Sequence, residues 1–163
     1  MRDTNLFGPV SLMRLVLPVM RSQGHGRIVN VTSAAAHGAA AYVSAYGGAK
    51  HALDAVTAAV DLEVAPFGVR AVSVVPGTYA TGANARLALA PVTDAYGDAH
   101  LRLVGALNKA FGSRTDLSVV SEAIIGAATA AEPEFITVAG PELDALIGSV
   151  IEAKSSFHAR LMH

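Results

Sequence analysis

The chain has 163 residues, of which 52% are hydrophobic and 15% charged, and its net charge is −1. This size and composition suit one domain with one core. Lysine and arginine are scattered along the chain, which argues against a nucleic acid or an anionic membrane as partner. The lack of cysteine excludes disulfides and thiolate metal sites, and no apolar run is long enough to span a membrane. We therefore expect a cytoplasmic protein.

The first half of the chain alternates between helix and strand patterns. Apolar residues recur at helical spacing over residues 6–23 and predict a helix. Runs rich in β-branched residues at 28–31 and 69–75 predict two buried strands. The apolar stripe over residues 45–65 predicts a helix that crosses between these strands. This order is typical of parallel α/β proteins.

The second half of the chain is less regular. The irregular spacing of apolar residues over 82–112 predicts short helices, and the length of this segment suggests a substrate loop or lid. Residues 119–127 predict a further helix, 135–139 a third strand and 143–150 a last helix. We expect a single truncated domain. Its parts are residues 1–81 with the catalytic motifs, 82–112 with the loop or lid, and 113–163 with the last helix, strand and helix.

The most informative local feature is a tyrosine followed four residues later by a lysine. On the predicted helix, Tyr46 and Lys50 lie one turn apart on the same face. A cation within about 4–6 Å of a phenol favours the phenolate and lowers its pKa. Tyr46 could therefore exchange a proton with a substrate near neutral pH. Ser33 lies thirteen residues before Tyr46, where the first predicted strand ends.

This pair belongs to a longer series of motifs. With Tyr46 and Lys50, their order and spacing resemble the C-terminal portion of a short-chain dehydrogenase/reductase. The resemblance implies an α/β fold, the C-terminal part of a Rossmann-like doubly wound parallel sheet, with about three parallel strands and flanking helices. The other matching segments are Thr-Asn-Leu-Phe-Gly (4–8), Leu-Pro-Val-Met (17–20), Gly-Arg-Ile-Val-Asn-Val-Thr-Ser (26–33), Ala-Pro-Phe-Gly-Val (65–69) and Pro-Gly-Thr-Tyr-Ala-Thr (76–81).

The resemblance implies a catalytic role for four residues. Tyr46 would act as general acid or base at the reacting oxygen, and Lys50 would lower the pKa of Tyr46. Ser33 would donate a hydrogen bond to the substrate oxygen, and Asn5 would anchor a water in a proton relay. The implied reaction is hydride transfer between NAD or NADP and a small-molecule alcohol or carbonyl substrate.

The resemblance also implies contacts with the cofactor. Tyr46 and Lys50 would hold the nicotinamide ribose, and the turn at Pro76 and Gly77 would border the nicotinamide. The Tyr79 backbone and the Thr81 hydroxyl would lie near its carboxamide. Members of the family commonly pair through the two helices predicted here at 6–23 and 45–65, so a homo-oligomer is expected.

Each assignment has a simpler alternative. Tyr46 and Lys50 could be an ordinary surface pair, Ser33 could bond to nearby backbone, and Asn5 could cap a helix. Tyr42 is a second phenol, but no cation follows it at the same spacing. The six histidines show no metal-ligand spacing, and no serine lies in a G-x-S-x-G motif.

One departure from the family is severe. Dinucleotide-binding folds hold the pyrophosphate on a glycine-rich turn between a strand and a helix, and the glycines of this chain form no G-x-G-x-x-G or comparable motif after a strand. We therefore expect the 163-residue chain alone to bind NAD or NADP poorly. We also expect the strand at 28–33 to have an unpaired edge. The alternative function is a non-catalytic truncated remnant that acts, if at all, as a dimerising module.

Overall fold

The computed structural model describes residues 2–39, 41–77, 79, 94–112, 116–140 and 142–162. Contacts divide the chain into two compact units. The first consists of Met1–Gly77 with Val119–His163, and the second of Thr78–Ser118. The expected single truncated domain, with its three parts, stays a prediction.

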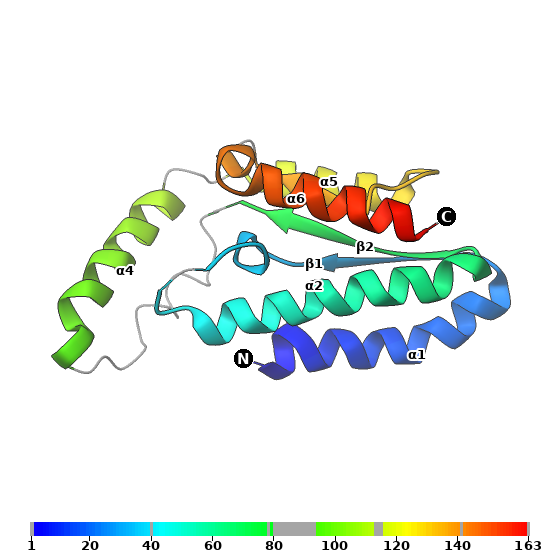
Figure 1. Cartoon of the computed structure of the whole chain (residues 1–163), viewed down its shortest axis with the longest axis horizontal. Helices are drawn as coiled ribbons and strands as arrows, with labels where there is room; N and C mark the ends of the chain where they lie inside the picture. Colours follow the sequence, from blue (N-terminus) through cyan, green and yellow to red (C-terminus); the bar gives the residue numbers. More distant parts are fainter. Residues whose placement is uncertain are drawn as a thin grey trace. The chain divides into compact units, whose positions relative to one another are not determined.

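The first unit is an α/β structure with a parallel three-stranded sheet, as the sequence predicted. Figure 1 shows β1 and β2 of this sheet. The strands lie in the order β1, β2, β3, with Gly26 of β1 opposite Val69 of β2 and Ser73 of β2 opposite Ile136 of β3. In chain order the elements are η1 (Asp3–Phe7), α1 (Gly8–Gln23), β1 (Gly26–Val31), η2 (Ala34–Ala36), α2 (Ser44–Val64), η3 (Ala65–Phe67), β2 (Val69–Pro76), α5 (Ser118–Thr129), β3 (Ile136–Ala139) and α6 (Glu142–Leu161).

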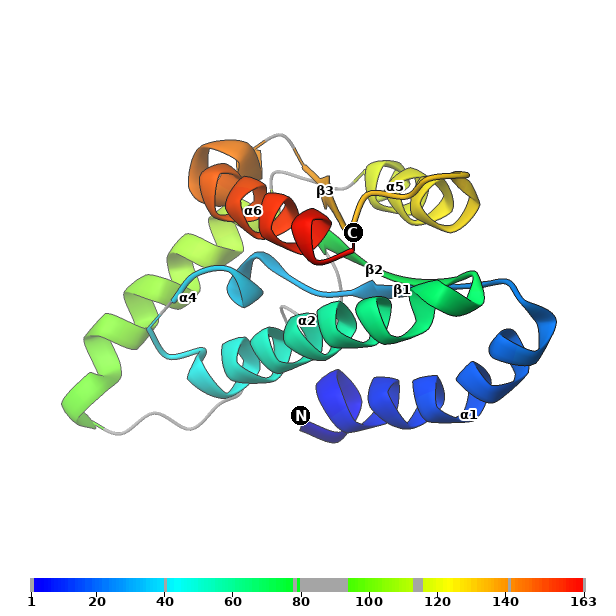
Figure 2. The ribbon, with the colours of Figure 1, turned by 45° about the vertical axis from the view of Figure 1, so that its right-hand side comes forward.

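Helices cover both faces of this sheet. On one face, α1 and α2 lie side by side (Figure 2), and α6 contacts the same face through Ile147 and Ile151, which pack with Val75 of β2. On the other face, α5 packs through Ala127 against Val72 and neighbouring side chains of β2. β2 is therefore buried on both faces, which explains its nearly continuous apolar sequence.

β1 differs from the buried strand that its sequence predicted. It pairs with β2 along one edge, and among the described residues no strand pairs with its other edge, in line with the expected unpaired edge. Most of its side chains are only half-buried, and Val31 is 39% exposed. An apolar run alone cannot distinguish a central strand from an edge strand, because both can be rich in valine and isoleucine.

Two glycines fix the turns that connect these elements. Gly24 ends α1 and Gly68 follows η3, each with φ of 71° in the left-handed region that favours glycine. The two turns also meet, because a Cβ at Gly68 would overlap the carbonyl oxygen of Gly24. Gly68 is therefore required both for its backbone angle and for the close approach of the turns that start β1 and β2.

The helix and strand positions otherwise follow the sequence, with two differences. The last helix continues to Leu161, well beyond the predicted end at residue 150. In the second unit, α4 (Gly97–Gly112) follows a short turn, η4 (Asp94–Tyr96), so residues 97–112 form one helix where several short ones were expected. The lid role of residues 82–112 stays a prediction. Within the described residues, no helix combines the length and apolar character of a membrane span.

Candidate active site

The candidate site lies where the parallel strands end. The ladder between β1 and β2 continues to Thr32, whose amide donates to the Val74 carbonyl at 2.9 Å. Pro76 ends β2, and the amide of Gly77 donates to the Ala139 carbonyl at 2.7 Å. Ligands of open α/β sheets bind outside the carboxyl ends of the strands. Ser33 and the turn at Pro76 and Gly77 therefore flank the edge where such a ligand binds.

The structure brings Tyr46 and Lys50 together at this edge. Both lie in the first turns of α2, and Lys50 Nζ is 5.9 Å from the centroid of the Tyr46 ring, within cation–π range. The same ammonium donates to the Val31 carbonyl at 2.9 Å. That carbonyl faces the unpaired edge of β1, because the next residue makes the bond to β2. Lys50 therefore joins the start of α2 to the end of β1.

The environment of Lys50 lowers the pKa of its ammonium group. Burial lowers the pKa of this lysine from its ordinary value of 10.5, because the ammonium is partly removed from water. An ammonium has three N–H donors, and the structure directs one to the Val31 carbonyl. The other donors can serve a ligand that binds at this edge.

Ser33 follows the end of β1 and makes a local bond. Its Oγ accepts a hydrogen bond from the Ala35 amide at 3.2 Å and so caps η2. This is the simpler role that the sequence left open for a strand-end serine. The hydroxyl hydrogen is a separate donor, so this contact leaves the proposed donation to a substrate chemically feasible. Gly47 of α2 lies close to the same turn, since a Cβ there would be 3.4 Å from the Ala35 carbonyl oxygen.

Asn5 lies in η1, a π-helical turn that runs directly into α1 and packs against α2. It is half-buried and sits inside the turn, so the alternative of a helix cap is wrong. π-helical turns are rare and often occur at functional sites. The water-anchoring role of Asn5 stays a prediction.

The remaining cofactor residues are only partly described. Tyr79 is buried and belongs to the second unit, and Thr81 lies outside the described residues. Tyr42, the rival phenol, is exposed and has φ of 63°, which is unusual for an aromatic residue. Asn30 is a buried core amide, and its Nδ2 donates to Thr57 Oγ1 at 2.9 Å.

Sequence reasoning missed two carboxylates on the buried face of α2. Asp54 lies one turn after Lys50 and accepts a bond from Ser73 Oγ at 3.1 Å. Asp61 lies two turns further along and accepts bonds from Arg70 Nε at 2.9 Å and from the Ala71 amide at 2.8 Å. The two aspartates recur at helical spacing on the apolar side of the predicted helix. This pattern could have indicated buried carboxylates with partners, because a charge on the buried side of a helix needs a partner.

Asp61 joins three elements of the first unit. It is fully buried, and it also accepts a bond from Arg70 Nη2 at 3.0 Å and lies 2.9 Å from His158 Nε2 on α6. Burial alone would raise the pKa of this carboxyl, but the bonds from Arg70, His158 and the Ala71 amide outweigh it and lower the pKa. These contacts hold α6 and β2 against α2.

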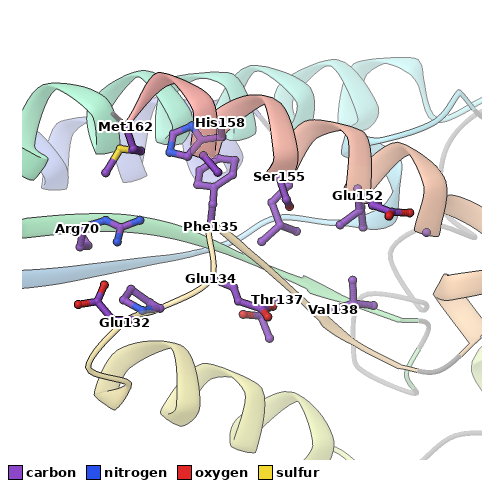
Figure 3. Close-up of a pocket in the computed structure, with 15 residues that line it drawn as sticks. Arg70, Glu132, Glu134, Phe135, Thr137, Val138, Glu152, Ser155, His158 and Met162 are labelled. Carbon is purple, nitrogen blue, oxygen red and sulfur yellow. The ribbon is translucent and has the colours of Figure 1, made fainter.

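The cavity beside this network is separate from the candidate site. It has a volume of about 820 Å³ and is bordered by β3, α6 and the segment before β3. Figure 3 shows the Phe135 ring beside His158, and their centroids are 3.9 Å apart. None of Asn5, Ser33, Tyr46 and Lys50 lines it. Within the described residues, no group of three or more acidic or histidine side chains is arranged to hold a metal ion.

The parallel sheet and the polar residues at its carboxyl edge define a Rossmann-like α/β protein. The family model described as short chain dehydrogenase matches residues 1–90, which is more than half of the chain. The chain therefore belongs to the short-chain dehydrogenase family.

Relatives of known name and structure agree with this assignment. A 3-ketodihydrosphingosine reductase of Bacteroides thetaiotaomicron is 29% identical over 147 residues, which cover 88% of this chain and 55% of the reductase. A short-chain dehydrogenase of Streptomyces avermitilis shares the fold, with a TM-score of 0.76 at 24% identity, over 98% of this chain and 58% of that one. A short chain dehydrogenase of Burkholderia cenocepacia, solved in complex with NADP, gives a TM-score of 0.67 at 22% identity, over 99% and 57% of the two chains. The chain thus spans just over half the length of these three proteins.

Proposed function

We propose that this chain carries the catalytic part of an NAD(P)-dependent oxidoreductase that interconverts an alcohol and a carbonyl compound. The observation that supports it most is the placement of Lys50 Nζ, 5.9 Å from the Tyr46 ring and bonded to the end of β1. Family membership and the oxidoreductase names of relatives support the reaction class. The whole protein's substrate, its choice between NAD and NADP and its cytoplasmic location stay predictions.

The residues present fit the nicotinamide end of the cofactor. Lys50 has donors suited to ribose hydroxyls, and the turn at Pro76 and Gly77 lies at the sheet edge where the nicotinamide would be bordered. The bound nicotinamide would supply or accept the hydride. For the pyrophosphate, the sequence contains no glycine-rich turn after a strand.

The protein side of the reaction is a proton transfer. During carbonyl reduction, the Tyr46 hydroxyl would give its proton to the substrate oxygen as the carbonyl carbon becomes an alcohol carbon. During oxidation, the Tyr46 oxygen would accept the proton from the alcohol. Ser33 would donate to the same substrate oxygen, and Asn5 would hold a water through which the proton passes from solvent to Tyr46 in reduction and from Tyr46 to solvent in oxidation. Lys50 would orient Tyr46 and the ribose.

The partner surface is proposed to be the outer face of α1 together with α2, in contact with a second copy. Four large apolar side chains of α1 are exposed although Met13 of the same helix is buried, and Leu15 is 72% exposed. A helix that is apolar on both sides buries its second side against a partner more often than it leaves it in water. The four residues are Leu12, Leu15, Val16 and Val19.

The proposed reaction can be tested by restoring a pyrophosphate site. A glycine-rich βαβ unit from a family member would be joined before residue 1, and deuteride transfer from 4-deuterated NADPH or NADH to a panel of ketones would be followed by mass spectrometry. We expect deuterium at the product's carbinol carbon, and weaker than micromolar NADPH binding by the unextended chain in isothermal titration. An extended chain that binds NADPH but transfers no deuteride to any ketone would favour the non-catalytic alternative.

A further inference from the structure

A polar cluster joins the C-terminal helix to the loop that follows β1. Lys154 Nζ on α6 donates to Asp54 Oδ2 on α2 at 2.9 Å. The same ammonium lies 3.2 Å from His37 Nδ1 and 3.5 Å from the Ala36 carbonyl oxygen, both in the loop. Ser73 of β2 donates to the other carboxylate oxygen of Asp54 at 3.1 Å. One lysine therefore connects α6, α2 and the loop, and its carboxylate partner connects them to β2.

The geometry fixes the state of the histidine in this cluster. An ammonium can only donate, so His37 Nδ1 must accept, and the ring proton must lie on Nε2. The His37 side chain is 0% exposed, and its Nε2 has no hydrogen-bond partner among the described residues, although Asp54 Oδ1 lies 4.0 Å away. Burial and the positive charge of Lys154 lower the pKa of His37, against the opposing effect of Asp54. His37 is therefore held neutral near pH 7.

The cluster lies next to the candidate site without touching its reacting atoms. Ala36 ends η2, the turn that Ser33 caps, and His37 follows it directly. On the other side, Asp54 lies one turn after Lys50 on the same helix. Lys154 thus binds both the loop of Ser33 and the helix of Tyr46 and Lys50.

We propose that Lys154 is a positioning residue for this site. By binding Asp54, His37 and the Ala36 carbonyl together, Lys154 holds the loop of Ser33 in place against α2. The proposal rests on the proposed function for its catalytic meaning, but its structural content can be tested separately. Without the ammonium, Asp54 would lose its counter-ion and His37 its hydrogen-bond donor. The loop would then open, because an unpaired buried carboxylate is costly.

The test uses the 163-residue chain and NMR spectroscopy, and it requires no turnover. In the wild-type chain, ¹⁵N shifts of the His37 ring should show the Nε2–H tautomer at pH 7.5. In Lys154→Met, the pKa of His37 should rise, because a repelling charge has gone and Asp54 remains.

The second measurement is amide exchange in the same variant. The amides of Ala36 and His37, which bond to the Ser33 and Ala34 carbonyls at 2.8 and 3.0 Å, should exchange at least about tenfold faster in Lys154→Met than in the wild-type chain. Lys154→Arg should restore much of this protection, and Lys109→Met on exposed α4 should change nothing.

The pH dependence supplies a further arm of the same test. Because the folded pKa of His37 lies below its ordinary value of 6.5, its stabilising contribution is complete above pH 6.5 and is lost as the pH falls through the folded pKa. Amide exchange in the wild-type loop should therefore accelerate, relative to its intrinsic rate, below pH 6.5. In Lys154→Met this acceleration should be smaller.

Two results would overturn the proposal. One is an Nδ1–H tautomer in the wild-type chain, which decides the matter even if Lys154→Met does not fold. The other is an unchanged His37 pKa together with unchanged exchange in a folded Lys154→Met. A failure of the redox assay would leave both measurements standing, so failure of the proposed function and failure of this inference can be told apart.

Discussion

The chemistry of the candidate site depends on one lysine that serves two structural partners. Lys50 binds the Val31 carbonyl at 2.9 Å and lies within cation–π distance of Tyr46. Its carbonyl partner faces the unpaired edge of β1, so the ammonium satisfies an acceptor that strand pairing leaves free in the described part of the chain. An apolar residue of similar length, such as methionine, could not donate to this carbonyl.

We expect the half-buried position of Lys50 to be visible in its titration. The folded pKa should lie below 10.5, because burial disfavours the charged form. The unfolded chain then holds this proton to higher pH, so stability should rise between the folded pKa and about 10.5. The measurement is the pH dependence of the Lys50 ¹³Cε shift, assigned by its loss in Lys50→Met. A midpoint at or above 10.5 would show that the ammonium stays fully hydrated.

At the scale of the elements, α2 is the helix that organises the first unit. Its apolar stripe packs on the sheet, and its two buried carboxylates bind β2 and α6. The bonds to Asp61 come from a guanidinium, a backbone amide and an imidazole, so both of its carboxylate oxygens have hydrogen-bond partners. Breaking a buried pair from one side is strongly destabilising.

Asp61→Asn should lower the free energy of unfolding by about 3–5 kcal/mol, because Arg70 and His158 lose the charge that they bind. Urea denaturation at pH 7 measures this change, and Glu63→Gln, on an exposed position of the same helix, is the matched control.

The folded pKa of Asp61 is lowered, so the contribution of its charge to stability is present above about pH 3.8 and is lost as the pH falls through the folded value. The variant should therefore show a shallower loss of stability in acid. Equal effects of the two substitutions would contradict this account.

The sequence predicted the elements better than the contacts between distant parts. Hydrophobic patterns located α1, α2 and the strands, because each helix buries one apolar stripe and β2 is a nearly continuous apolar run buried on both faces. The extension of α6 was missed, since Ser155 and Ser156 follow Lys154 and the apolar pattern weakens there. The bond from Lys154 to Asp54 spans 100 residues of sequence. No local pattern indicates such a pair, and only the packing of α6 beside α2 brings it together.

At the scale of the whole molecule, the outer face of α1 carries several exposed large apolar side chains in the described part of the chain. Its exposed apolar residues repeat at helical spacing, while Met13 faces inward. The family resemblance of the sequence implied pairing through this helix and α2, and we propose that a second copy covers the exposed residues.

Leu15→Glu should convert the proposed homodimer into monomers, because a carboxylate would be desolvated at the centre of the contact. Light scattering coupled to size-exclusion chromatography gives the mass directly. The control is Ile125→Glu on α5, a substitution of an apolar side chain that is also well exposed, at 61%. Equal masses for Leu15→Glu and the wild-type chain would show that α1 is not the interface.

The central claim is that the phenol of Tyr46 moves the proton of the reaction. In the chain extended with a glycine-rich unit, Tyr46→Phe should lower kcat by about 10² to 10⁴-fold, the range expected for a general acid or base, with little change in cofactor affinity. Tyr42→Phe, which removes the rival phenol, should leave kcat near the wild-type value. If instead Tyr46→Phe kept its turnover, or Tyr42→Phe lost it, the assignment of the acid/base to Tyr46 would be contradicted.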